Sequence, residues 1–330
     1  MALNAKRILV VALGVVAVAL ALPGYASASY GWPLKPFNRA HPVRGQLNDP
    51  RNNDLTFDSA SSRSFHQGLD ISAPDGTAVY AVAPGRVHYK DPTALAVRGK
   101  NDAVIFGYWH IVPAVRDHEI VKLHQLLGYI NVGYGHVHFA EKRNRWFVNP
   151  LRRGGLTPYT DTTPPTINSI SYYDGAYHDL SDTTLSGAVR ITVNAYDTPQ
   201  LVSNWPLAVV TPAWIGWQLF NADGQEIETG DWDFRYVLCP LNPTDVFAPG
   251  TRKNGSHTVA SYNYWIGTDW DTNLIPDGKH WQIGGPEWLT TLVPNGTYRL
   301  VVTVADTRGN ESTKTVSFTV ANEPATSNPA

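Results

Sequence analysis

Alternation of apolar and polar residues at period two is the feature that most limits the fold of this chain. Apolar residues recur at every second position over Val189–Ala195, Tyr298–Val304 and Val316–Val320, and the turn Asp306–Asn310 separates the last two segments. Such alternation is typical of strands with one buried face. The chain is also rich in turn formers, with 27 Gly and 24 Pro among 330 residues. We therefore predict an all-β protein whose second half is a β-sandwich.

A proline-rich segment, Thr157–Pro165, divides the chain into two parts. Two adjacent prolines within a Thr/Asp cluster continue neither a helix nor the interior of a sheet, so this segment is predicted to be a linker. The chain length also suits two domains of about 150 residues each. The predicted organisation is a signal peptide over 1–28, a first antiparallel β-sheet domain over 29–156, a linker over 157–165, a β-sandwich with an insertion over 166–322 and a disordered tail over 323–330.

The first 28 residues have the pattern of a secretory signal. Two basic residues, Lys6 and Arg7, precede the apolar run Ile8–Leu22, and a small-x-small site follows at Ala26–Ala28. We expect cleavage after Ala28 and a secreted protein, extracellular or associated with the cell wall. The alternative is an uncleaved anchor, although a run of 15 residues is shorter than the ~20 that a membrane span needs. The single cysteine, Cys239, excludes an intrachain disulfide and is expected to be a small buried hydrophobe.

Charge is distributed unequally between the two halves. Residues 29–160 carry 16 Lys/Arg and 10 Asp/Glu, a balance of +6, whereas residues 161–330 carry 8 and 18, a balance of −10. A basic first half outside a cell would be attracted to anionic wall polymers, and the alternative is ordinary solvated surface charge. The sequence contains no nucleic-acid-binding signature.

Histidines gather in the first half, where eight of the eleven lie. In Phe65–Asp70 a His and an Asp are four residues apart, and in Gly135–Phe139 two His are two residues apart. Residues two apart in a strand share a face, so His136 and His138 are expected to point into the same space. His110 has the same strand parity as Val104, Phe106 and Tyr108. Two His and one Asp suit Zn²⁺, and a further His beside them would serve metal-assisted hydrolysis of an amide.

The order and spacing of these motifs resemble the lysostaphin-type zinc endopeptidases, which cleave peptide bonds in the bacterial cell wall. The resemblance covers roughly residues 31–142. It rests on Phe-His66-Gln-Gly-Leu-Asp70 followed by Gly76-Thr-Ala-Val-Tyr-Ala81, then Tyr108-Trp-His110, then Leu127-Gly128 and His136-Val-His138-Phe139, with Gly31-Trp-Pro-Leu34 and Gly45–Arg51 upstream.

Position by position, the resemblance implies that His66, Asp70 and His138 bind zinc. It implies that His136 is the general base or the hydrogen-bonding partner of the attacking water, and that His110 stabilises the tetrahedral intermediate. It also implies that the first domain is a small antiparallel β-sheet metallopeptidase domain with a groove across the metal. Three departures, Trp109 before His110, Ala140 after Phe139 and Val132–Gly135 before His136, affect the groove wall and specificity more than the metal site. Trp109 also affects the placement of His110. His88, His118 and His124 match no position of the family and are expected to be surface or hydrogen-bonded residues.

The two ends of the second half, roughly 160–200 and 290–322, resemble bacterial immunoglobulin-like domains through Asp161-Thr-Thr-Pro-Pro165 and Asn295-Gly-Thr-Tyr-Arg-Leu300 with Ala305-Asp-Thr-Arg-Gly-Asn310. The middle, about 201–290, is longer than such a domain requires and is predicted to contain an inserted excursion. Eight of the eleven Trp follow residue 160; they are expected to fill the core, and the alternative is an exposed surface that stacks on sugar rings.

The leading hypothesis is a secreted zinc metallopeptidase that acts on peptidoglycan peptides, as a monomer and without membrane attachment after signal cleavage. A second hypothesis is an inactive peptidase fold that binds the cell wall or regulates another hydrolase. A third is an adhesion or structural protein whose second half carries the function. The presence of all three expected ligands favours the first hypothesis over the second.

Overall fold

The computed structural model describes residues 29–51, 64–180, 183–201, 203, 209–251, 262–266, 270–274, 280–284 and 287–323. Nearly all regular structure in these residues is β, and nearly all strand pairs are antiparallel, as predicted. The predicted signal segment and most of the predicted tail lie outside the described residues. Within the described part of the chain, no helix has the length and apolar character that crossing a membrane requires.

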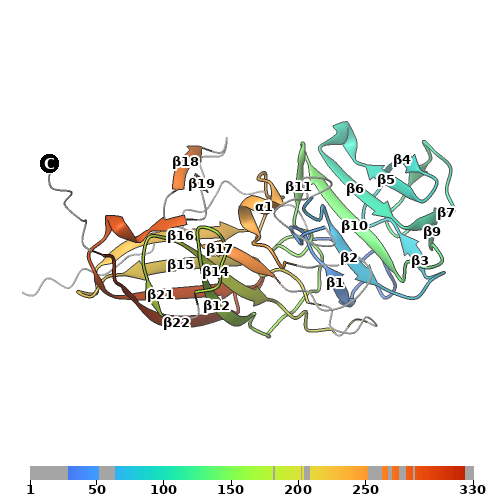
Figure 1. Cartoon of the computed structure of the whole chain (residues 1–330). Helices are drawn as coiled ribbons and strands as arrows, with labels where there is room; N and C mark the ends of the chain where they lie inside the picture. The colour runs from blue at the N-terminus through green and yellow to red at the C-terminus, as the bar shows by residue number, and fades with distance from the viewer. Residues whose placement is uncertain are drawn as a thin grey trace, which may run out of the picture.

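The strands form two bodies that lie side by side along the molecule (Figure 1). The strands of the first body are β1 (Val43–Gly45), β2 (Leu69–Ser72), β3 (Ala78–Tyr80), β4 (Gly85–Asp91), β5 (Ala94–Arg98), β6 (Val104–Trp109), β7 (Ile111–Pro113), β8 (Ile120–Val121), β9 (Leu126–Ile130), β10 (His136–Arg143) and β11 (Trp146–Val148). Those of the second body are β12 (Thr166–Asp174), β13 (Thr184–Leu185), β14 (Ala188–Tyr196), β15 (Trp214–Phe220), β16 (Glu226–Asp233), β17 (Asn263–Ile266), β18 (Trp270–Leu274), β19 (His280–Gly284), β20 (Glu287–Leu289), β21 (Gly296–Ala305) and β22 (Glu311–Val320). The helical segments are α1 (Pro243–Val246) and two 3-10 turns, Lys100–Asp102 and Thr290–Leu292.

The first body is built on a sheet of order β1-β2-β10-β6-β5-β4-β8, to which β11 adds beside β10. A smaller sheet, β3-β9-β7, lies beside it. Period-two alternation separates the two faces of the central strands. In β2, Leu69 and Ile71 are fully buried in the core, as are Val137 and Phe139 in β10. The intervening polar residues of both strands therefore face away from this core, toward the cleft described below.

The second body is a β-sandwich. One sheet has the order β12-β14-β17, with β20 also paired to β14, and the other has the order β13-β22-β21-β15-β16. A single apolar cluster with members from both sheets fills the space between them. Both β17 and β20 pair with β14, at Ile191–Asn194 and at Ala188–Arg190, and the β18–β19 hairpin interrupts the chain between them. The predicted all-β, antiparallel architecture is thus confirmed, whereas the bounds of the insertion and the immunoglobulin-like character of the sandwich stay predictions.

Several residues of the second body occupy the places expected for them. Trp217, Trp232 and Trp288 belong to the sandwich core, as the core interpretation of the Trp residues predicts. The side chains of Trp205, Trp270 and Trp281 lie outside the described residues. Cys239 is buried in the same core, and burial raises the pKa of its thiol to about 12, so it behaves as an inert hydrophobe.

The loop that follows β1 in the first body inserts into the second body. The Asn48 amide donates to the carbonyl of Val237 at 2.9 Å and accepts from the N–H of Cys239 at 2.7 Å. The Asp49 carboxylate accepts from the N–H of Thr211 at 2.8 Å. Asn48 and Asp49 are both fully buried, so these hydrogen bonds lie inside the junction between the two bodies. The two bodies are therefore joined by a buried, hydrogen-bonded interface.

Asn48 tests how far this junction stabilises the protein. Asn48 has φ 71°, so glycine keeps the backbone while removing the amide. We expect Asn48→Gly to lower the free energy of unfolding by about 2–4 kcal/mol, because the buried N–H of Cys239 and the half-buried carbonyl of Val237 both lose their partner. Asn144→Gly is the matched control, with φ 52° and an exposed side chain. Urea unfolding of both variants measures the difference, and equal stabilities would show that the junction contributes nothing.

Candidate active site

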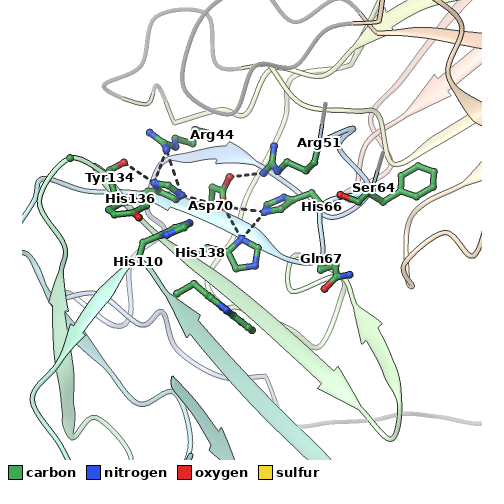
Figure 2. Close-up of a pocket in the computed structure, with 13 residues that line it drawn as sticks. Arg44, Arg51, Ser64, His66, Gln67, Asp70, His110, Tyr134, His136 and His138 are labelled. Atoms are coloured by element: carbon green, nitrogen blue, oxygen red, sulfur yellow. Dashed lines mark hydrogen bonds and ion pairs between the residues drawn. The ribbon is translucent and has the colours of Figure 1, made fainter. Parts of the chain in front are cut away.

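Three predicted site residues meet at the floor of a cleft in the first body. Asp70 lies in β2 and His138 in β10, and these two strands pair with His138 directly opposite Asp70. His66 comes from the segment before β2. The Nε2 atom of His66 lies 2.7 Å from Nδ1 of His138 and 3.1 Å from Oδ1 of Asp70, and His138 Nδ1 lies 3.0 Å from the same oxygen. Figure 2 shows these three side chains turned toward one another.

Hydrogen bonding fixes the tautomer of His66. Its Nδ1 lies 2.8 Å from the carbonyl oxygen of Gln46. A carbonyl only accepts, so Nδ1 carries the proton and Nε2 presents a lone pair. This lone pair faces the Oδ1 atom of Asp70 at 3.1 Å. Two acceptors at that distance repel each other unless a cation or a proton lies between them.

Charge states in the cleft also suit a bound cation. Burial lowers the pKa of His66 to about 3, with a further contribution from Arg51. Burial alone would raise the pKa of Asp70, but His66 and the Arg51 guanidinium, whose Nη2 lies 2.6 Å from Oδ2, hold it well below its usual value. A neutral imidazole and an ionised carboxylate are therefore present at neutral pH. The donor set of two imidazole nitrogens and one carboxylate oxygen fits Zn²⁺.

His136 shares the cleft face of β10 with His138, as strand parity predicts. Its Nε2 lies 3.5 Å from Asp70 Oδ1. Its Nδ1 lies 2.7 Å from the carbonyl oxygen of Tyr134 and 2.6 Å from Nη2 of Arg44. The carbonyl requires a protonated Nδ1 and the guanidinium an unprotonated one, so the two contacts favour opposite tautomers. Burial, reinforced by Arg44, lowers the pKa of His136 to about 4, which leaves the ring neutral.

His110 faces the cleft because it follows strand β6, not because of the alternation of side chains along that strand. Strand β6 ends at Trp109, and His110 has φ 64°, in the left-handed region. The alternation that buries Tyr108 therefore stops at Trp109, and the parity predicted for His110 is wrong. The turn brings the His110 ring beside that of His136, with the centroids 4.7 Å apart, and stacks it on the Tyr134 ring, with the centroids 4.2 Å apart. Burial lowers the pKa of His110 to about 4, assisted by the neighbouring His136 and His138.

Trp109 packs against the site instead of blocking it. Its ring lies over Gly107, where a Cβ would come within 2.1 Å of the ring. It also meets the His138 ring edge-to-face, with the centroids 5.2 Å apart. The large residue at this position therefore restrains one predicted ligand.

The cleft has a volume of about 680 Å³ and is open to solvent. Trp109 lies in its wall, and the wall also includes residues for which the sequence suggested no role, namely Arg44, Arg51, Gln67 and Tyr134. Arg44 and Arg51 lie within or beside the Gly45–Arg51 motif, but no spacing rule pairs them with Asp70 or His136. The three histidines that match no position of the family lie elsewhere: His88 and His118 adjoin Asp117 away from the cleft, and His124 stacks on Phe37.

A comparison with protein-family models finds one match in this part of the chain. Residues 64–150 match the model of Peptidase family M23, and this range contains all five predicted site residues. Over this range the first body is similar to peptidase family M23. No curated protein matches the chain.

The similar solved structures have low identity to this chain. Csd3 of Helicobacter pylori is 18% identical over 42% of this chain and 37% of its own, with a TM-score of 0.32. A zinc-containing peptidase from Vibrio cholerae is 21% identical over 37% of this chain and 39% of its own, with a TM-score of 0.28. Lysostaphin from Staphylococcus simulans is 12% identical over 79% of this chain and 100% of its own, with a TM-score of 0.31. The chain thus spans well under half the length of the first two.

The second body supports the M23 site through Phe65. This side chain belongs to the apolar core of the sandwich, where its ring lies 5.9 Å from Phe247. The next residue, His66, forms backbone hydrogen bonds to Asn48 at 3.0 Å and to Asp49 at 2.7 Å. One predicted metal ligand is therefore held by the junction between the two bodies.

Glycine is required at position 68, between His66 and Asp70. A Cβ at Gly68 would lie 2.9 Å from Nε2 of His138 and 2.5 Å from the carbonyl oxygen of Phe139. We expect Gly68→Ala to displace the His138 ring and weaken Zn²⁺ binding by about 10–100-fold, measured by competition with a chromophoric chelator. Gly175→Ala is the control, since its Cβ meets nothing closer than 3.7 Å. Unchanged affinity in Gly68→Ala would contradict the packing argument.

Truncation of Phe65 separates stability from site geometry. Phe65→Ala and Phe247→Ala both open a cavity in the same core and are expected to destabilise the protein by about 3–5 kcal/mol. Only Phe65 adjoins a predicted ligand, so only Phe65→Ala should also lower Zn²⁺ affinity, by about 10-fold or more. Thermal unfolding and Zn²⁺ titration of both variants test this, and parallel losses of affinity would show that general destabilisation is the cause.

Proposed function

We propose that the protein is a secreted zinc endopeptidase that hydrolyses peptide bonds of bacterial peptidoglycan. The observation that carries this proposal is the convergence of His66 Nε2, Asp70 Oδ1 and His138 Nδ1 at the floor of an open cleft in an M23 domain. A zinc ion held by these residues would supply a Lewis acid for the scissile carbonyl and lower the pKa of an attacking water to about 7.

In this proposal His136 moves the proton. With Nδ1–H donating to the Tyr134 carbonyl, the Nε2 lone pair faces the site and accepts a proton from the attacking water. The protonated ring then holds a positive charge beside the Arg44 guanidinium, which disfavours it. The ring therefore returns the proton readily to the departing amide nitrogen. The depressed pKa of His136 matches a group that must be neutral before each cycle.

The neutral ring of His110 complements this role. It stacks on Tyr134 and lies beside His136, so its N–H group is available to the oxyanion that develops on the scissile carbonyl. The left-handed backbone at His110 is stored strain of the kind that occurs at functional sites, because non-glycine residues rarely adopt it. Arg51 and Gln46 keep Asp70 and His66 in their binding orientations.

The substrate assignment rests on the dimensions of the cleft, the family and the export pattern. A volume of about 680 Å³ with Trp109 and Tyr134 in its walls suits an extended peptide segment. The signal pattern over 1–28 supports action outside the cytoplasm, where peptidoglycan lies. The excess of Lys/Arg over residues 29–160 would attract the chain to anionic wall polymers.

Three variants distinguish an enzyme from a binding protein. His138→Ala should abolish stoichiometric zinc and hydrolysis together. His136→Ala should keep zinc and lose about 10²–10⁴-fold in kcat. His118→Ala, an exposed histidine outside the cleft, should retain both zinc and activity. Zinc content by atomic emission and release of amino groups from purified cell walls are the two measurements, with chelation and zinc re-addition for the wild type.

The outcomes separate the hypotheses. Wild-type protein with one zinc per chain and no hydrolysis of walls of several cross-link types would favour a binding or regulatory role for the M23 domain. Hydrolysis that persists in His138→Ala or after chelation would contradict the metal mechanism. Full activity in His136→Ala would remove this residue from the proton transfer.

A further inference from the structure

Three carboxylates of the described residues are buried together outside the M23 site. Asp161, Asp197 and Asp306 are 6%, 4% and 3% exposed, and one oxygen of each lies within 4.8 Å of the others. Asp161 belongs to the predicted linker, Asp197 follows β14, and Asp306 follows β21. Three chain segments far apart in sequence thus each contribute one carboxylate to a buried cluster near the linker.

Two of these carboxylates have ordinary hydrogen-bond partners. Asp161 accepts from the Thr163 N–H at 3.0 Å and from the Tyr159 hydroxyl at 3.1 Å. Asp306 accepts from the N–H groups of Arg308 and Asn310 at 2.7 and 2.9 Å, and from the Asn310 amide at 2.7 Å. All these donors belong to local turns, so they position the carboxylates without neutralising them.

Asp197 is compensated at one oxygen only, through a hydrogen bond from the backbone of Thr198. Its Oδ1 atom is buried and has no hydrogen-bond partner, although the group is one of three carboxylates within reach of one another. A buried acceptor without a partner is costly, and a buried charge even more so. This oxygen therefore requires a ligand or a proton.

No described basic side chain forms an ion pair with any of the three carboxylates. Arg308, on whose pKa Asp306 and Asp161 act, directs its Nε to the carbonyl oxygen of Tyr159 at 3.1 Å and places its guanidinium over the Tyr159 ring. Burial and mutual repulsion raise the pKa of Asp197 well above its usual value, and burial raises that of Asp161. The cluster thus concentrates negative charge that a cation would stabilise.

We propose that Asp161, Asp197 and Asp306 bind a calcium ion. The donor set consists of oxygen atoms alone, which selects a hard cation and distinguishes this cluster from the His/Asp site in the M23 domain. Calcium accepts irregular arrangements of six to eight oxygens, whereas magnesium demands near-octahedral geometry. Carboxylates from three separate segments, with water or backbone carbonyls completing the shell, suit calcium better.

Calcium at this place would fasten the linker to the sandwich. The Asn310 amide donates to the Asp161 carbonyl at 2.8 Å, and Trp32 of the first body donates to the Pro158 carbonyl at 2.8 Å. The linker thus connects both bodies on either side of Asp161. Binding would hold the linker in its observed path and stabilise the attachment of the first body, in proportion to the calcium concentration.

The test uses the full mature chain, stripped with a chelator and reloaded with one equivalent of zinc. Calorimetric titration with CaCl2 should give one site per chain, and the thermal midpoint should rise with added calcium. Terbium is a second probe, because Tyr159 lies against Asp161 and would sensitise its luminescence. His138→Ala and Asp117→Asn are controls that should leave calcium binding unchanged.

Asp197→Asn is the decisive variant. It should weaken calcium binding by about 100-fold or more and remove the calcium-dependent rise in thermal midpoint. In metal-free protein it should raise the midpoint, because it relieves repulsion between buried carboxylates. Asp306→Asn serves the same purpose if Asp197→Asn does not fold. The absence of calcium binding in the wild type, or equal binding in the wild type and both variants, would overturn the proposal.

Discussion

The site depends on one constraint: two acceptor atoms, Nε2 of His66 and Oδ1 of Asp70, face each other at 3.1 Å with a lone pair on each. The Gln46 carbonyl holds the tautomer of His66, the Arg51 guanidinium keeps Asp70 ionised, and burial keeps the imidazole neutral. Each effect prepares a donor for a cation instead of a hydrogen bond. The β2–β10 register then adds His138, and Gly68 leaves room for its ring. The orientation and charge of the three donor groups are therefore set by neighbouring backbone groups and by the Arg51 guanidinium.

The second body contributes to this preparation. Phe65 is buried in the sandwich core, and Asn48 and Asp49 bridge from the backbone of His66 to that same body. The three predicted ligands thus depend on two hydrophobic cores, so loss of packing in the sandwich core is expected to shift His66 as well. The sandwich is a structural support for the site as well as a candidate for contacts of its own.

Much of the fold and part of the site were predictable because they depend on local rules. Period-two alternation separates Leu69 and Ile71 from Asp70, and Val137 from His136 and His138, so the strands and the cleft face follow from the sequence. His110 shows the limit of that rule, because one left-handed residue ended the alternation. The roles of Arg44 and Arg51 depend on contacts across the fold, as does the attachment of the loop after β1 to the second body. No spacing within the sequence encodes such long-range contacts.

The division of one sandwich strand into β17 and β20 has a consequence for the evolution of the chain. Both pieces are aligned on β14, so the chain leaves this sheet and returns to it beside the same strand. The β18–β19 hairpin is therefore an appendage whose length and composition can change without altering the pairing of the sheet that carries it. Relatives of this protein are expected to differ there first. A new recognition element could be acquired at that point while the junction that supports the cleft stays intact.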